Sequence, residues 1–127
     1  MYSKIDKVDQ AIETYKKILV LYPTNTVSRE RLISIYYKTG QEKLAEDNME
    51  EMKKIFSPGD LKRKRLGLIY LRHGKLNESI AELKSIVSAW PDDQEARYYL
   101  GTALEENGDF DEAYKTLISL IPTAIIL

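Results

Sequence analysis

The stretch from Asp92 to Ile121, DDQEARYYLGTALEENGDFDEAYKTLISLI, decides the fold. Apolar and small residues recur at helical spacing on both sides of Asn107-Gly108-Asp109, which is a typical turn sequence. This pattern predicts two short amphipathic helices that meet at a tight turn. Leu100 and Gly101 lie midway along the first helix, and Ala113 and Leu117 lie on the inner face of the second.

The rest of the chain repeats this stretch with a period of 34 residues. A fixed period near 34 with two helices in each unit indicates a helical repeat array, in which each helix pair covers the open face of its neighbour. Four series of residues carry the period: glycines at 40, 74 and 108; leucines at 32, 66 and 100; Ala11, Ala45, Ser79 and Ala113; and Tyr15, Met49, Leu83 and Leu117.

The period divides the chain into a leading half repeat and three full repeats within one domain, residues 1–127. The half repeat covers 1–25, and the full repeats cover 26–59, 60–93 and 94–127. Gly40 is expected to end a helix in a left-handed conformation, and Ser57 to begin one as an N-cap. Two D-x-x-E pairs, Asp92 with Glu95 and Asp109 with Glu112, are expected to cap the last two helices.

Composition excludes several classes of protein. The chain has 127 residues and a net charge of −1, which argues against a general nucleic-acid binder. It has no cysteine, so disulfides and thiolate zinc sites are excluded, and no apolar run reaches the roughly 18 residues that span a bilayer. Residues 1–10 are too polar for a signal peptide, which favours a cytoplasmic location.

Catalysis and cofactor binding are not expected. The only histidine, His73, stands beside a turn glycine, where it fits a helix C-terminus rather than a metal site. The glycines follow the repeat period instead of forming a phosphate-binding loop. We therefore predict a protein that is not an enzyme and that binds neither metal nor cofactor.

The repeated residues resemble the tetratricopeptide repeat (TPR) family. Leu66-Gly67 with Tyr70, followed by Ser79, Leu83, Ile86 and Pro91, has the order of large, small and closing residues that marks this family. The third repeat has the same order, and the first is a looser match because Ile33 replaces a small residue. The resemblance implies an all-α fold: a right-handed superhelical array of antiparallel helix pairs with about three and a half repeats.

In this family the first helices of successive repeats line a concave groove that binds a peptide or a helix of another protein. The resemblance therefore implies a non-catalytic interaction scaffold whose partner is a protein or peptide. Tyr37, Leu68, Leu71 and Tyr98 are expected to be more exposed than a solvated face needs, although packing between neighbouring repeats is the alternative. The groove positions carried over are Ser34, Tyr37, Lys64, Arg65, Leu68, Leu71, Tyr98 and Thr102.

One version of this groove, which clamps a C-terminal carboxylate, is not expected here. The positions that would supply its cations and amides are Glu30, Ser34, Arg65, Glu95 and Tyr99, and none of the five matches. The basic run Lys62-Arg63-Lys64-Arg65 spreads around a helix, so it fits a solvated surface better than a basic stripe, although Lys64 and Arg65 could meet an acidic partner.

Self-association is the alternative function. The array begins on half a repeat and ends on the apolar segment IPTAIIL, which predicts either a fragment of a longer protein or an end that docks elsewhere. Two open faces could join copies into a homodimer. One is on the first helix, with Ile12, Tyr15 and Leu19, and the other is in the tail, with Ile125 and Ile126.

Overall fold

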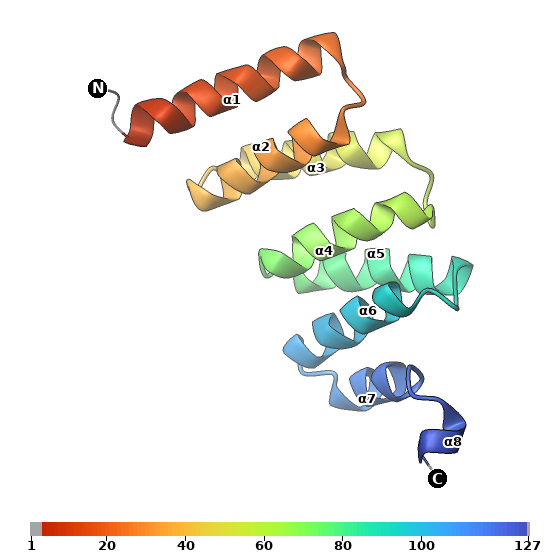
Figure 1. Cartoon of the computed structure of the whole chain (residues 1–127). Helices are drawn as coiled ribbons and strands as arrows, with labels where there is room; N and C mark the ends of the chain where they lie inside the picture. The colour runs from red at the N-terminus through yellow and green to blue at the C-terminus, as the bar shows by residue number, and fades with distance from the viewer. Residues whose placement is uncertain (1–3, 127) are drawn as a thin grey trace. The chain divides into compact units, whose positions relative to one another are not determined.

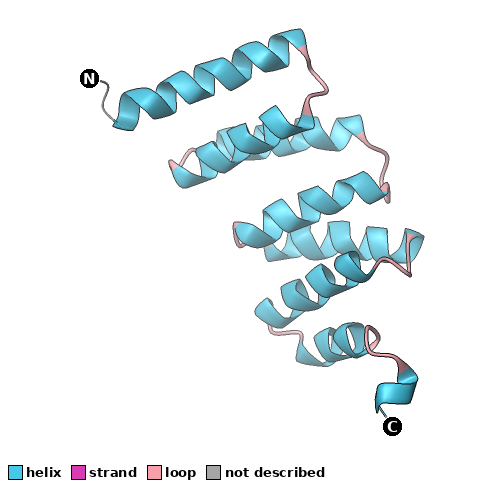
Figure 2. Ribbon diagram, in the orientation of Figure 1, coloured by secondary structure: helices cyan, strands magenta, loops and turns pink. Residues whose placement is uncertain are grey.

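The computed structural model describes residues 4–126, and every element in that range is helical (Figures 1 and 2). This confirms the all-α helical repeat array predicted from the sequence. The elements are α1 (Lys4–Leu21), α2 (Thr26–Lys38), α3 (Glu42–Ile55), the 3₁₀ turn η1 (Leu61–Arg63), α4 (Lys64–Arg72), α5 (Leu76–Ala89), α6 (Gln94–Glu106), α7 (Phe110–Ile118) and α8 (Thr123–Ile126).

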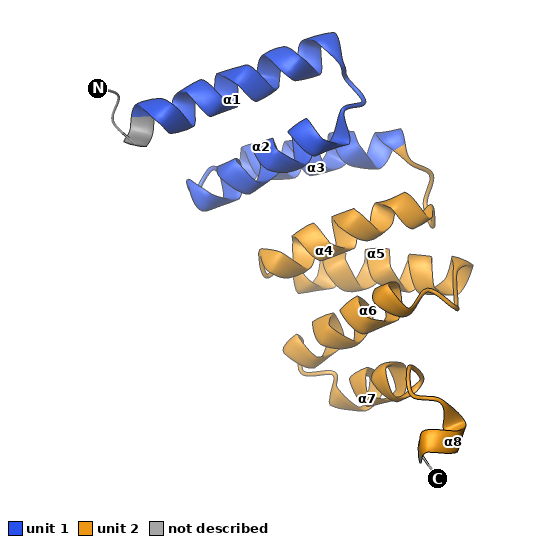
Figure 3. Ribbon diagram, in the orientation of Figure 1, with its two compact units in different colours: residues 1–55 blue, residues 56–127 orange. Residues whose placement is uncertain are grey.

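The helices fall into two compact units, residues 1–55 and 56–127 (Figure 3). The first unit holds α1, α2 and α3, and the second holds η1 and α4 to α8. The division lies close to the expected boundary between the first and second full repeats. A single domain over the whole chain stays a prediction.

In the first unit α2 packs against both α1 and α3. Its inner face is buried through Leu32, Ile33 and Tyr36, and Met49 of α3 is also buried. The thioether of Met49 is flexible and unbranched, so it can fit beside the bulky Ile33. The wider helix spacing that Ile33 predicts for this repeat remains a prediction.

In the second unit the helices pack in sequence order, α4 on α5, α5 on α6 and α6 on α7, and α4 also contacts α6. One cluster of buried residues joins the last three of these helices: Leu83, Leu100, Ala103, Leu104 and Ala113. Helix α6 therefore shares apolar side chains with both of its neighbours, α5 and α7, as a solenoid requires.

Two helix crossings in the second unit depend on glycine. A Cβ added at Gly67 would lie 2.7 Å from Leu83 Cγ, and one added at Gly101 would lie 2.5 Å from Leu117 Cγ. Next to the first crossing, the Ser79 hydroxyl donates to the Gly67 carbonyl over 2.8 Å. These contacts confirm the expectation that small residues occupy the positions where the helices approach each other.

The turns between paired helices use the expected glycines. Gly40, Gly74 and Gly108 have φ values of 77°, 73° and 86°, a conformation that side chains with a Cβ disfavour. Each glycine therefore follows the first helix of a repeat, and the second helix begins two residues later.

Three predicted helix caps are wrong in detail. Asp93, not Asp92, is the N-cap of α6, and its carboxylate accepts the Ala96 N–H over 2.7 Å. Asp60, not Ser57, caps the η1 turn. Asp109 occupies the N-cap position of α7, but its carboxylate accepts from the Asn107 amide instead of the backbone.

Candidate functional site

The first helices of the second and third repeats, α4 and α6, contact each other in the second unit. We use the name α4–α6 surface for Arg65 and Leu71 on α4 together with Tyr98 and Thr102 on α6. The Tyr98 side chain is 56% exposed, although its ring centroid lies only 6.2 Å from that of Tyr99. The two rings are tilted by 60°, so Tyr99 supports Tyr98 while leaving its outer side open to solvent.

The expectation that Leu68 and Leu71 are unusually exposed is wrong for Leu68, which is 8% exposed. Leu71 is half-buried and packs against the cluster formed by α5, α6 and α7. Packing within the array therefore accounts for most of their apolar area. Sequence spacing could not show this, because the contact between α4 and α6 comes from neighbouring repeats.

Lys64 is held by acidic residues of its own chain. Its amine lies 3.1 Å from both carboxylate oxygens of Asp93 and 3.7 Å from Glu95 Oε1. The Ala96 N–H and Lys64 together hold the pKa of Asp93 below its usual value, against the opposing effect of burial. Lys64 therefore links the start of α4 to the start of α6 instead of offering a free cation.

Arginines at positions 29, 63 and 97 form a further periodic series that the sequence analysis missed. Arg63 is buried and contacts Glu82 of α5 over 2.6 Å. One period earlier, Arg29 donates to Asn48 over 2.9 Å, and one period later Arg97 donates to Ser119 over 3.3 Å. The 34-residue spacing of the three arginines is the signal that could have found these links. Two of the four residues in the basic run, Arg63 and Lys64, are therefore held by acidic residues of the same chain.

The remaining groove residues, Ser34 and Tyr37, lie in the first unit. Both belong to α2 and are half-buried. In the second unit Thr102 is also half-buried, and its hydroxyl donates to the Tyr98 carbonyl of its own helix over 3.0 Å. Only Tyr98 among the aromatic groove positions is strongly exposed.

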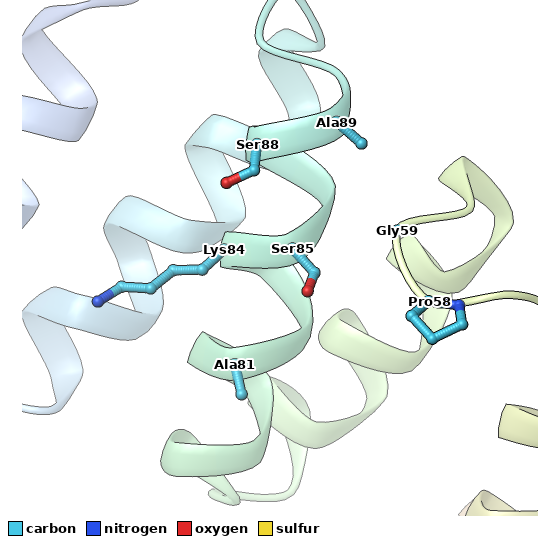
Figure 4. Close-up of a pocket in the computed structure, with 7 residues that line it drawn as sticks. All are labelled: Pro58, Gly59, Ala81, Lys84, Ser85, Ser88 and Ala89. Carbon is cyan, nitrogen blue, oxygen red and sulfur yellow. The ribbon is translucent and has the colours of Figure 1, made fainter.

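A hollow of about 670 Å³ lies beside α5 and is lined by small side chains (Figure 4). Ser85 and Ala89 lie on the side of the Pro58-Gly59 turn, whereas Lys84 extends away from it. The Lys84 amine contacts Glu112 over 3.0 Å. The hollow therefore presents few groups that could hold a ligand.

The residues expected on the two open terminal faces differ in their exposure to solvent. Ile12 is 8% exposed because α1 packs on α2, so its assignment to an uncovered face is wrong. Tyr15 and Leu19 are half-buried. Ile125 in α8 is 72% exposed, and the Ile126 side chain lies outside the residues that the structure describes.

Among the residues with described side chains, no three histidine, cysteine or acidic residues are arranged to hold a metal ion. Over the same part of the chain, no helix combines the length and the apolar character that a bilayer crossing needs.

These features define the class of the protein: a helical repeat built from antiparallel pairs, with glycine turns and small residues at the crossings. Two tetratricopeptide repeat models match the sequence, one over residues 64–123 and the other over residues 1–25. Together they cover more than half of the chain. The chain belongs to the tetratricopeptide repeat family, whose members are generally protein-interaction scaffolds.

One solved structure, titled "Crystal structure of MamA", is similar to this chain with a TM-score of 0.61 and 23% sequence identity. The similarity covers 96% of this chain and 77% of that one. At this identity it supports the fold alone. The search of curated proteins found no match to this sequence.

Proposed function

We propose that the α4–α6 surface binds a peptide segment or a helix of another protein. The observation that carries this proposal is Tyr98, a large aromatic side chain that is held by Tyr99 but remains 56% exposed. A tyrosine with a supported ring and an open outer side is typical of residues that dominate protein interfaces.

The charges around Tyr98 favour a ligand with a cationic group. Glu95 is exposed at the start of α6, Glu105 is exposed near its end, and Lys64 is already held by Asp93 and Glu95. Arg65 is an exposed basic residue on the α4 side. A terminal carboxylate would meet Glu95 here, so an internal segment of a partner is the better ligand.

Selection of peptides from a displayed random library on the wild-type chain, followed by calorimetric titration, tests the proposal. Tyr98→Ala should weaken the binding of a selected peptide by at least tenfold, because an aromatic interface anchor contributes about 2 kcal/mol or more. Tyr22→Ala is the matched control, since Tyr22 is 62% exposed but follows α1 in the first unit. Equal affinity for wild type and Tyr98→Ala would refute the proposal.

Self-association is the second candidate. Exposed apolar residues at the C-terminal end of the second unit support it, with Ile121 at 43% and Ile125 at 72% exposure. Exposed apolar residues that gather on one face usually mark an interface. Light scattering during size-exclusion chromatography tests it, since a mass that stays at 14.7 kDa at all concentrations would exclude it.

A further inference from the structure

The outer face of α7 carries a row of large apolar side chains that nothing in the described structure covers. Phe110 and Tyr114 are one helical turn apart and are 67% and 65% exposed. Ile118 continues along the helix as a half-buried residue, and the exposed Ile121 follows, whereas Leu117 lies on the inner side against Gly101 of α6. We call this row the α7 face.

The equivalent face of α5, one repeat earlier, is covered by another helix. One period earlier, the positions of Tyr114 and Ile121 are held by Ile80 and Val87 on α5. Both pack against the cluster to which α6 contributes most of the side chains. The α7 face is thus equivalent to a surface that buries apolar side chains beneath a helix elsewhere in the same chain.

The residue types on the α7 face differ from those on the covered face. Phe110 and Tyr114 stand where α5 has Leu76 and Ile80. Aromatic side chains, and tyrosine in particular with its polar tip, suit a surface that alternates between water and a partner. This substitution favours an interface that exchanges between free and bound states.

Charges beside the α7 face indicate which partner fits. Asp111 and Lys115 are exposed, lie one turn apart on α7 and carry opposite charges. When two copies of α7 pack antiparallel about a two-fold axis near residues 113 and 114, Asp111 of each copy faces Lys115 of the other. In the same arrangement Tyr114 of one copy lies near Tyr114 of the other, and Phe110 lies near Ile118. One face thus supplies both halves of a self-complementary contact.

We propose that a second copy of this chain docks on the α7 face, forming a symmetric antiparallel α7–α7 dimer. This inference rests on the second proposed function and specifies its site. In this register Ile121 and Ile125 extend beyond the partner copy's α7, so Phe110, Tyr114 and Ile118 would contribute on the order of 300 Å² from each copy. The total of about 600 Å² is smaller than most specific interfaces, so the dimer should be weak and should dissociate on dilution.

Charge reversal tests the register of this dimer. Asp111→Lys places lysine against lysine at both symmetric contacts, and Lys115→Glu places acid against acid. Each variant alone should remain at 14.7 kDa from micromolar to millimolar concentration, where the wild type rises towards twice that mass. An equimolar mixture of the two variants should restore the dimer, because each contact then joins opposite charges. A folding defect could not be repaired in this way.

Serine substitutions test the location. Phe110→Ser with Tyr114→Ser should abolish the dimer, whereas Val20→Ser with Leu21→Ser should leave it intact, although Val20 and Leu21 are 80% and 71% exposed. A wild-type mass of 14.7 kDa at every concentration would overturn self-association as a whole. A wild-type dimer that both charge variants retain, or that their mixture fails to restore, would overturn the α7 site alone.

Discussion

Replacing Gly67 with alanine adds a methyl group at the tightest part of the second repeat. The new Cβ would lie 2.7 Å from both Cγ and Cδ2 of Leu83, a side chain that is fully buried and has no free space to enter. Alanine gains about 1 kcal/mol over glycine from helix propensity. Overpacking in a filled core costs about 1–3 kcal/mol, and the 2.8 Å bond from Ser79 to the Gly67 carbonyl would also be strained. We expect Gly67→Ala to lower the free energy of unfolding by about 1–2 kcal/mol.

Gly101→Ala is the matched comparison from the next repeat. Its Cβ would lie 2.5 Å from Leu117 Cγ, so distance alone predicts at least as large a cost. Leu117, however, is only half-buried and lies on the last long helix, where it can turn towards solvent. The gain in helix propensity then offsets most of the clash, and we expect a change within about 0.5 kcal/mol of zero.

Urea unfolding followed by circular dichroism measures both variants, with the slope of each transition compared to confirm that the same unit unfolds. Leu83→Met is the compensating change, because the first repeat pairs Met49 with the bulky Ile33 at the equivalent positions. Gly67→Ala with Leu83→Met should recover part of the loss in a double-mutant cycle. A cost at Gly101 equal to or larger than that at Gly67 would refute the reasoning from side-chain burial.

Two further predictions concern the polar links in the second unit. Asp93→Ala should lower the free energy of unfolding in urea by about 1–2 kcal/mol, because it removes the cap on the Ala96 N–H and the ion pair with Lys64. The pKa of Asp93 is lowered in the folded chain, so this stabilisation is present above the unfolded-state pKa of about 3.9 and is lost as the pH falls through the folded-state pKa. Asp93→Asn should therefore flatten the pH dependence of the free energy of unfolding in that range. Glu82→Ala should cost about 3 kcal/mol by leaving the buried Arg63 without its carboxylate, whereas Arg63→Met with Glu82→Leu should restore most of that stability; a single and a double variant of equal stability would contradict this account.

The fold could be predicted from the sequence because each repeat contains the same pattern of turn glycines and small residues. Each turn glycine and each small residue at a crossing recurs after 34 residues, so one ambiguous position is corrected by the others. The cap of α6 was misplaced by one residue because Asp92 and Asp93 are adjacent and only the backbone geometry selects between them. The repeat period favours Asp93, since Asn25, which stands two 34-residue periods earlier, caps α2.

The candidate site was less predictable because exposure in a repeat array depends on neighbouring helices. Leu68 has the spacing of an outward residue, but it is only 8% exposed in the folded array. The α7 face was missed for the opposite reason: Phe110 and Tyr114 have the spacing of covered residues, yet no described helix packs on them. Arg63 has the charge of a surface residue but lies buried against Glu82.

The most direct test of the proposed scaffold function is an amide chemical-shift titration of the chain with a library-selected peptide. Our account predicts that the largest changes fall on α4 and α6, around Arg65, Leu71, Tyr98 and Thr102, and that Tyr98→Ala removes them. Changes concentrated instead on the outer side of α5, at Ala81, Ser85 and Ser88, would contradict the assignment of the α4–α6 surface as the binding site.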